Sequence, residues 1–246
     1  MPVEFRADLH IHSCLSPCAD LFMTPRNIIE KAASLGINLI AVCDHNSAEN
    51  IAVTQDIGRT RGITVVPGME ITSSEEVHLL GLFRNLDSAY AMQAQVYEHL
   101  QQGENDEDAF GMQVVVNEED EVLGFNKRLL IGSTDLSVNR IIALIHEFQG
   151  IAIASHIDRE GFGIIGQLGF IPPETNFDAL EISSQTGMDK ASERFGMYRS
   201  IPWITSSDAH RLDDIGRKTT GLYMHHATFD ELRLALEGRD NRKVIP

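Results

Sequence analysis

The feature that most constrains the fold is an apolar run from Ile37 to Cys43, which lies between a helix end and a polar triplet. Gly36 before the run is typical of the position that follows a helix, and Asp44-His45-Asn46 comes directly after it. A nearly continuous apolar run of this length predicts a strand that is covered on both faces, as in a parallel sheet.

The same order of strand, loop and helix recurs along most of the 246 residues. Strands are predicted at 3–9, 37–43, 63–66, 76–83, 151–155, 178–183 and 201–206. Helices are predicted at about 24–35, 47–61, 87–102, 137–149 and 228–237. This alternation indicates an α/β fold with a parallel sheet, either closed as a barrel or open, and the pattern alone does not choose between the two.

The middle of the chain departs from this order. Residues 112–116 and 122–125 are apolar and flank a charged turn at 117–121, which predicts a β-hairpin. Because this piece is too small to hold much core of its own, we expect residues 103–131 to form an insertion within a single domain that spans 1–246.

Composition excludes several classes of function. A formal net charge of -16 argues against a protein that wraps duplex nucleic acid along a basic face. No apolar run approaches the roughly 20 residues that a membrane span needs, and the first residues do not resemble a secretory signal, so we expect a cytoplasmic protein. Three cysteines, Cys14, Cys18 and Cys43, do not suggest a disulfide framework, and small thiols are favoured over metal ligands at these positions.

Histidines and carboxylates gather near predicted strand ends. His10 and His12 stand one residue apart on an extended segment, so both side chains point to the same side and can reach one metal ion. Alone, this pair is a weak signal. The carboxyl ends of strands form the working face of α/β folds, and the other residues of ligand type near them are Asp20, His45, Glu70, His156, Asp208 and His210. His78 lies inside a predicted strand, where a hydrogen-bonded core histidine is the alternative.

Such a set suits a particular chemistry. A carboxylate that bridges two cations about 3.5–4 Å apart lets them lower the pKa of a shared water, and the resulting hydroxide can attack phosphorus. Mixed nitrogen and oxygen ligands favour Zn, Mn or Fe over Mg or Ca alone. Asp44, next to His45, is expected to orient an imidazole. Arg159 is a candidate donor to a substrate phosphate, with a solvated arginine as the alternative.

Five motifs in a fixed order identify a family. They are Asp8-Leu-His-Ile-His12-Ser13, Cys43-Asp44-His45-Asn46, Pro67-Gly-Met-Glu70, Ser155-His156 and Ser206-Ser-Asp208-Ala-His210. Together they resemble the PHP (polymerase and histidinol phosphatase) family, and most closely its small stand-alone, TrpH-like metal-dependent phosphoesterases. The resemblance implies a distorted (β/α)7 barrel that holds two to three divalent ions at the carboxyl ends of its strands.

The resemblance also implies a ligand set for each ion. The first ion would be held by His10, His12, Glu70 and Asp208. Glu70 would bridge to the second, which is completed by His78 and His156. The third would be held by Asp20, His45 and His210. Cys18 competes with Asp20, because relatives often place this Asp directly after a serine, whereas here three residues follow Ser16 before it. The residues expected to carry catalysis are Glu70, Asp208, His12 and Arg159.

The implied activity is hydrolysis of a phosphomonoester, either a nucleoside 3′,5′-bisphosphate or the 5′ end of a short single-stranded oligonucleotide. Histidinol-phosphate phosphatase is the alternative within the class. Hydrolysis of a C–N bond is a further alternative, but no lysine that could bridge two metals stands beside the ligands. A non-catalytic PHP scaffold would be expected to have lost ligands. The physiological substrate, the native metal, the oligomeric state and the role of residues 103–131 stay open at this point.

Overall fold

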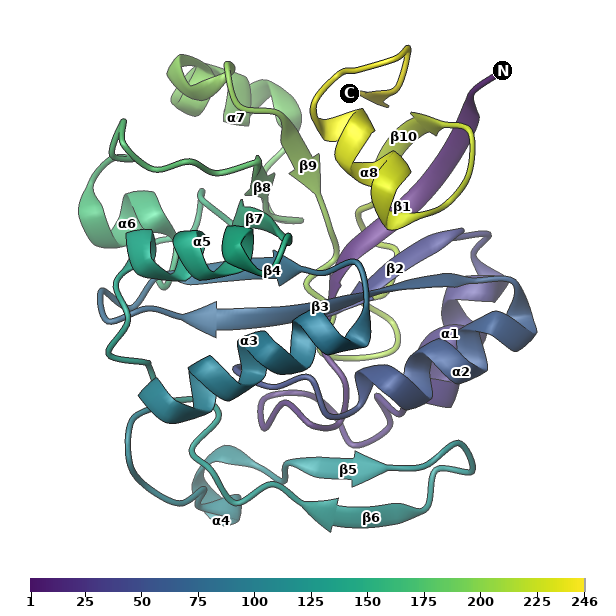
Figure 1. Ribbon diagram of the computed structural model, residues 1–246, viewed down its shortest axis with the longest axis vertical. Coiled ribbons are helices and arrows are strands. Elements are labelled where there is room, and N and C mark those ends of the chain that lie inside the picture. Colours follow the sequence, from purple (N-terminus) through teal and green to yellow (C-terminus); the bar gives the residue numbers. More distant parts are fainter. Residues whose placement is uncertain (246) are drawn as a thin grey trace.

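The computed structural model describes residues 1–245, and its main feature is a nine-stranded sheet that curls into a nearly closed barrel (Figure 1). The sheet has the order β11-β10-β1-β2-β3-β4-β7-β8-β9. Its strands are β1 (Val3–Ile11), β2 (Leu39–Val42), β3 (Thr64–Thr72), β4 (His78–Leu82), β7 (Ile151–Ala154), β8 (Ala179–Ile182), β9 (Trp203–Thr205), β10 (Thr220–Met224) and β11 (Lys243–Ile245). The predicted α/β barrel is therefore confirmed.

Helices connect most of the strands and cover the outside of the barrel. They are α1 (Pro25–Ser34), α2 (Ile51–Arg61), α3 (Leu86–His99), α4 (Glu107–Phe110), α5 (Val138–Glu147), α6 (Ile164–Leu168), α7 (Met188–Phe195) and α8 (Phe229–Leu236), with a 3-10 turn at Gly196–Tyr198. Within residues 1–245, none of these helices has the length and apolar character needed to cross a membrane.

The sheet is mixed rather than wholly parallel. Strands β1, β2 and β3 run parallel to one another, and so do β7, β8 and β9. Strand β4 lies between these two groups and is antiparallel to both of its neighbours. As a result, the amino end of β4 meets the carboxyl ends of the parallel strands at one edge of the barrel.

The barrel closes next to β1. The amino-terminal half of β1 pairs with β10 from Val3 to Ala7, and its other end forms a bridge between Ile11 and Ala209. Strand β9 contacts β10 through threonine side chains, because the Thr205 backbone N–H donates to Thr220 Oγ1 at 2.9 Å. The segment after β9 is thereby held beside the end of β1.

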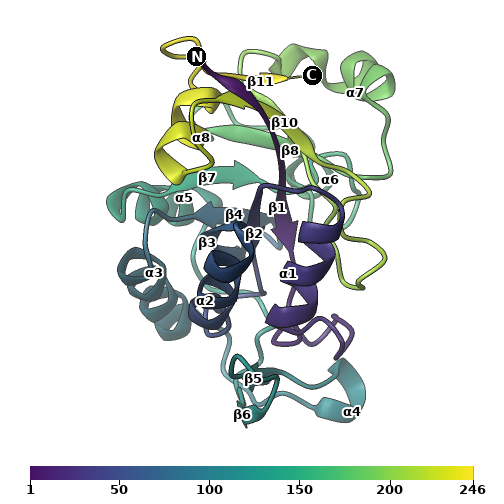
Figure 2. The ribbon, with the colours of Figure 1, turned by 90° about the vertical axis from the view of Figure 1, so that its right-hand side faces the viewer.

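Alternation along the strands separates an interior from an exterior. Interior apolar side chains come from β1, β2, β3, β4, β7, β8, β9 and β10 and include Ala7, Leu9, Leu39, Ala41, Val66, Leu80, Ile153, Ala179, Ile204 and Leu222. Apolar side chains of α8 join this group at the end of the barrel where β1 begins (Figure 1). On the outside, α1 and α2 pack over β1 and β2 (Figure 2), and α3 and α5 pack over β3 and β4.

A β-bulge in β1 directs the first two histidines inward. Asp8 is opposite Ile40 and Ile11 is opposite Val42, so β1 contains one extra residue between these pairs. Leu9 packs in the barrel interior, whereas Ile11 packs under the outer helices. An extra residue of this kind changes which side chains face inward. His10 and His12 are two residues apart, so their side chains enter the same end of the barrel.

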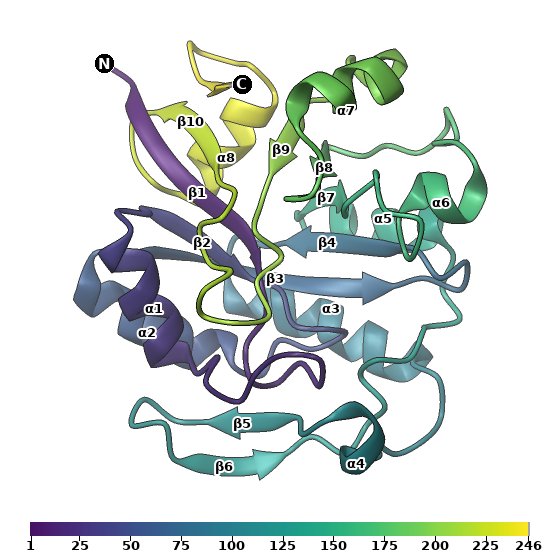
Figure 3. The ribbon, with the colours of Figure 1, turned by 180° about the vertical axis from the view of Figure 1, so that it is seen from behind.

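The predicted hairpin is present. Strands β5 (Val114–Val116) and β6 (Val122–Phe125) pair antiparallel in a separate sheet, below the barrel in Figure 3. The hairpin rests on the loop that follows β1, because Val114 N–H donates to the Cys14 carbonyl at 2.9 Å. Cys14, Val114 and Val116 form a small buried cluster at this contact.

Candidate metal centre

The candidate ligands meet at one end of the barrel. His10 lies near the end of β1, His45 follows β2, His156 follows β7, and Asp208 and His210 follow β9. Glu70 lies within β3, which is longer than the sequence predicted. His78 is the first residue of β4, and because that strand is antiparallel, His78 lies at the same edge as the others. This orientation explains why His78 looked like an exception in the sequence.

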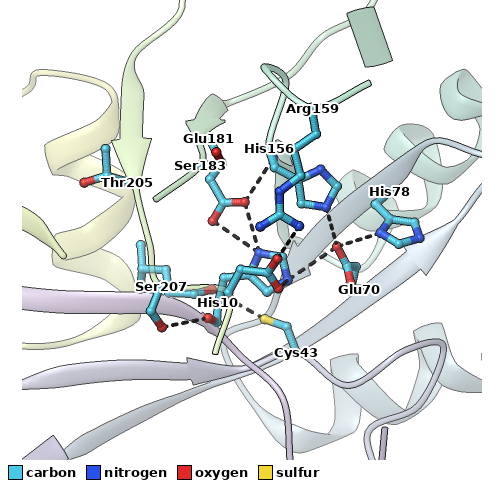
Figure 4. A network of polar contacts seen from close by, with 12 residues as sticks. His10, Cys43, Glu70, His78, His156, Arg159, Glu181, Ser183, Thr205 and Ser207 are labelled. Atoms are coloured by element: carbon cyan, nitrogen blue, oxygen red, sulfur yellow. Dashed lines mark hydrogen bonds and ion pairs between the residues drawn. The ribbon is translucent and has the colours of Figure 1, made fainter. Parts of the chain in front are cut away.

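Glu70 occupies the middle of the cluster, as the dashed lines in Figure 4 show for three of its contacts. Its Oε1 lies 3.0 Å from His78 Nδ1 and 3.4 Å from both His10 Nε2 and His156 Nε2. Its Oε2 lies 3.3 Å from His45 Nδ1 and 3.4 Å from His12 Nε2. The side chain is 1% exposed. One buried carboxylate thus faces five imidazoles.

A neighbouring glycine allows β3 to approach β2 closely just before Glu70. A Cβ on Gly68 would lie 2.5 Å from Cys43 Sγ and 2.8 Å from the Val42 carbonyl oxygen. Any larger residue would push the two strands apart at the level of the cluster.

Asp208 joins the first pair of histidines to an arginine. Its Oδ1 lies 3.2 Å from the Nε2 atoms of both His10 and His12, and 3.7 Å from His210 Nδ1. Its Oδ2 lies 2.6 Å from Arg159 Nη1. The Arg159 side chain is 29% exposed, so it stands at the rim of the cluster rather than inside it.

Two of these residues have backbone conformations that side chains rarely adopt. The φ angle of His156 is +26° and that of Asp208 is +50°. Positive φ costs free energy in residues other than glycine and persists only where the surroundings fix it. At His156 the fixing contact is a hydrogen bond from its N–H to Glu181 Oε2, at 3.0 Å.

Three groups of ligand-type atoms have all their members within 4.8 Å of one another: His10, His12 and Asp208; His45, Glu70 and His78; and His12, Cys18, His45 and His210. Asp20 belongs to none of these groups within the described part of the chain. Its Oδ1 accepts a hydrogen bond from the Phe22 backbone N–H at 2.9 Å. The geometry therefore favours Cys18 over Asp20 beside His45 and His210.

Glu181 is a member of the cluster that the sequence did not reveal. It lies on β8 with its side chain on the interior face, next to Ala179, and is 1% exposed. Its Oε2 and Oε1 lie 3.0 and 3.2 Å from His10 Nδ1 (Figure 4). With Nδ1 donating to Glu181, His10 would present the lone pair of Nε2 to a cation once the Nε2 proton is released.

Asp44 acts through a serine instead of directly on a histidine. The carboxylate accepts hydrogen bonds from Ser13 Oγ and Ser16 Oγ, both at 2.6 Å. Ser16 Oγ in turn lies 3.0 Å from His12 Nδ1 and accepts from the His45 backbone N–H at 3.2 Å. Asp44 therefore reaches the His12 imidazole through the Ser16 hydroxyl.

The two central carboxyl groups are ionised. Burial opposes ionisation of Glu70, but the charges of His78 and His10 outweigh it and hold its pKa well below the ordinary value. Burial also opposes ionisation of Asp208, and here His10 and His12 keep the pKa below its usual range. Ionised carboxylates are the form that binds cations.

The histidines divide into two states. Burial lowers the pKa of His12 to about 4 and that of His45 well below its ordinary value, so both rings are neutral at pH 7. Burial also disfavours a charge on His10, but Glu181 and Asp208 raise its pKa above 6.5. Neutral imidazoles are the form that ligates a metal.

The residues present fit a metal centre. Glu70 Oε1, His45 Nδ1 and His78 Nδ1 are buried and have no hydrogen-bond partner, although they lie close to one another. Buried polar atoms are almost always satisfied, and exceptions often mark a missing ion. Buried nitrogen and oxygen atoms that lie this close together without hydrogen-bond partners are expected of groups that share cations.

Sequence relatives match parts of the chain, and no family model matches it. The chain is 34% identical over 106 residues to the uncharacterized protein YqxK of Bacillus subtilis, covering 41% of this chain and 27% of YqxK. It is 31% identical over 86 residues to a 5′-3′ exoribonuclease of Haemophilus influenzae, covering 34% of this chain and 30% of the exoribonuclease. It is 35% identical over 78 residues to the 3′,5′-nucleoside bisphosphate phosphatase of Chromobacterium violaceum, covering 30% and 26%. Each match spans less than a third of the relative's length.

Solved structures with a similar fold cover nearly the whole chain. The lesion-specific endonuclease PfuEndoQ of Pyrococcus furiosus superposes with a TM-score of 0.77 at 20% identity, over 98% of this chain and 58% of that one. A two-domain protein of Bacteroides vulgatus that contains a predicted PHP-like metal-dependent phosphoesterase gives 0.61 at 14% identity, over 99% and 65%. This chain therefore has the fold of these proteins, one of which contains a predicted PHP-like metal-dependent phosphoesterase, and the predicted resemblance to PHP-like phosphoesterases is confirmed at the level of the fold. Among the sequence relatives are a phosphatase and a ribonuclease, both of which cleave phosphate esters.

Proposed function

We propose that this chain is a metal-dependent phosphoesterase that acts as one domain, with residues 103–131 inserted in it. The observation that carries the proposal is the position of Glu70, whose buried carboxylate faces five imidazoles at 3.0–3.4 Å. A folded chain gains little from so many unsatisfied polar groups in one place unless cations hold them.

The proposed ligands are the two central carboxylates and the histidines around them: Glu70, Asp208, His10, His12, His45, His78, His156 and His210. Glu70 and Asp208 supply the negative charge, and the histidines supply nitrogen donors, with His10 releasing its Nε2 proton when a cation binds. Two or three Zn, Mn or Fe ions bound there would provide the Lewis acidity that activates water and withdraws charge from phosphate oxygens. Glu70 Oε1 faces His10, His78 and His156, whereas Oε2 faces His12 and His45, so both oxygens would be available to hold cations.

Arg159 is the proposed phosphate-binding side chain. It keeps Asp208 in place through Nη1, and its Nε is buried without a hydrogen-bond partner. A guanidinium carries five donors in a planar fork that matches phosphate oxygens, so Arg159 can hold Asp208 and a substrate oxygen at the same time. This contact would orient the phosphate at the rim of the cluster.

The proposed substrate is a nucleotide or the 5′ end of a short single strand. An exposed aromatic ring beside the cluster supports this choice: Phe162 stacks on His78 with ring centroids 4.4 Å apart and an interplanar angle of 17°. The Phe162 side chain is 45% exposed, which leaves room for a base on the ring. Bases stack on aromatic side chains in many single-strand binding proteins. The names of the ribonuclease and bisphosphate phosphatase relatives agree with this substrate class.

A panel of phosphate esters tests the proposal. Phosphate release would be measured with adenosine 3′,5′-bisphosphate, a 5′-phosphorylated oligonucleotide and histidinol phosphate. Strand cleavage would be measured with a 27-mer duplex that carries an abasic lesion, because the fold relative Endonuclease Q has been crystallised with such a duplex. We expect turnover of the first two substrates, loss of turnover in Glu70→Gln, and unchanged turnover in Glu193→Gln, an exposed control on α7. Turnover of histidinol phosphate or of the duplex alone would contradict the substrate class, and an active Glu70→Gln would contradict the site.

A further inference from the structure

The third group of ligand-type atoms contains a thiol. Cys18 lies on the loop after β1, and its ligand atom is within 4.8 Å of those of His12, His45 and His210. It is the exposed cysteine of the three. Cys14 and Cys43 are buried, and their Sγ atoms lie 3.7 and 3.5 Å from backbone carbonyls. Within the described part of the chain, Cys18 is thus the cysteine whose thiol belongs to a group of ligand-type atoms.

Asp20 stabilises the loop through one backbone and one side-chain hydrogen bond. Its N–H donates to the His210 carbonyl at 2.9 Å, and its carboxylate accepts from Phe22 N–H at 2.9 Å. A carboxylate that bonds the backbone two residues on forms a local turn. Asp20 thus helps to hold the backbone of His210, while its carboxylate bonds within its own turn and belongs to none of the three groups in the described part of the chain.

The loop that carries Cys18 is fixed from both sides. Ser13 N–H and Oγ donate to the two oxygens of Asp44 at 2.7 and 2.6 Å, and Ala19 N–H donates to the Ser16 carbonyl at 3.0 Å. These bonds tie the turn before and after Cys18. The backbone at Cys18 is therefore held near the imidazoles.

We propose that Cys18 supplies a thiolate ligand to a cation that is also held by His45 and His210, next to the site to which His12 turns its Nε2. This inference rests on the proposed metal-dependent function and replaces Asp20 in the ligand set implied by the family resemblance. Binding releases the thiol proton to solvent, because the thiolate is the form that ligates.

A sulfur ligand changes which metals the site accepts. One thiolate with imidazole nitrogens suits Zn²⁺, Co²⁺ or Fe²⁺, whereas Mg²⁺ and Ca²⁺ prefer oxygen ligands. The site is therefore expected to discriminate against Mg²⁺ more strongly than a site completed by a carboxylate.

Cobalt titration of the metal-free full chain tests the ligand without an activity assay. Wild type is expected to show a sulfur-to-cobalt charge-transfer band in the near ultraviolet. The band should persist in the matched control Cys14→Ser and in Asp20→Asn, and disappear in Cys18→Ser. Loss of a direct ligand should weaken Zn²⁺ binding at this site by more than about 100-fold, since even outer contacts cost about 10- to 100-fold.

Alkylation of the wild-type chain gives a readout that needs no variant. Iodoacetamide labelling followed by peptide mass spectrometry should show that Zn²⁺ protects Cys18. A charge-transfer band that survives in Cys18→Ser, or labelling of Cys18 at the same rate with and without Zn²⁺, would overturn the inference. If the thiol binds cobalt but no phosphate ester is turned over, the proposed function fails while the ligand assignment stands.

Discussion

Replacement of Glu181 by glutamine is the sharpest perturbation of the cluster, because it changes a charge without changing shape or touching a proposed metal. Glu181 Oε2 lies 3.0 Å from His10 Nδ1 and accepts from the His156 N–H at 3.0 Å. A glutamine whose oxygen takes that place keeps both contacts, but its amide group then faces His10 Nδ1 from the position where Oε1 lay at 3.2 Å. The charge-assisted hydrogen bond between His10 Nδ1 and residue 181 becomes a neutral one, and the new amide N–H faces the Nδ1–H of His10.

The size of the effect follows from these contacts. Charge-assisted hydrogen bonds are roughly twice as strong as neutral ones, and loss of an outer contact to a ligating histidine costs about 10- to 100-fold in metal affinity or activity. That range corresponds to about 1.4–2.8 kcal/mol. We therefore expect Glu181→Gln to bind Zn²⁺ about 10- to 100-fold more weakly than wild type.

Competition with a chromogenic chelator measures this affinity, and phosphate release at several zinc concentrations measures the consequence. If Glu181 acts by orienting His10, high zinc should restore much of kcat in the variant. Glu193→Gln is the control, since Glu193 is exposed on α7. Equal zinc affinity in wild type and Glu181→Gln would refute the reasoning.

Three further outcomes are expected. Phe162→Ala should raise KM for adenosine 3′,5′-bisphosphate about 5- to 150-fold, which is the equivalent of about 1–3 kcal/mol of base stacking, and leave KM for glycerol phosphate, which has no ring, unchanged; equal effects on both would argue against a base platform. Dialysis against a strong chelator should abolish turnover and lower Tm, with both recovered on addition of Zn²⁺ or Mn²⁺ but not Ca²⁺. The hydrogen bond from Arg242 lowers the pKa of Glu231 from 4.5 to about 2, so this pair stabilises the native state above pH 4.5 and its contribution is lost as the pH falls towards 2. Denaturant titrations should therefore show a smaller loss of stability over this pH range in Glu231→Gln than in wild type.

Much of the barrel was predictable because its strands carry a strong local signal. The run from Ile37 to Cys43 is apolar on both faces, and β2 lies within it. The direction of β4 was not predictable, because the sequence 78–82 is equally apolar in a parallel and an antiparallel strand. That direction decides whether His78 lies at the working edge or in the core, so the placement of His78 needed the three-dimensional structure.

The cluster was predictable where a residue stands at a strand end and hidden where it does not. The spacing of His10 and His12 predicted that they share one face, although the bulge that turns them inward has no sequence signature. Glu181 is a single glutamate in the apolar strand 179–182. The signal in the sequence is its spacing of two residues from Ala179, which places both side chains on the interior face of the strand. Cys18 lies in an irregular loop where counting along the sequence does not tell which side chain faces inward.

The most direct test of the metal centre is the metal content of the purified chain, measured by elemental analysis in wild type and in Glu70→Gln. The arrangement around Glu70 predicts two to three Zn, Mn or Fe ions per wild-type chain and a clear loss of ions in a variant that remains folded. A wild-type chain that retains no stoichiometric divalent metal, and takes none up from zinc-containing or manganese-containing buffer, would contradict it.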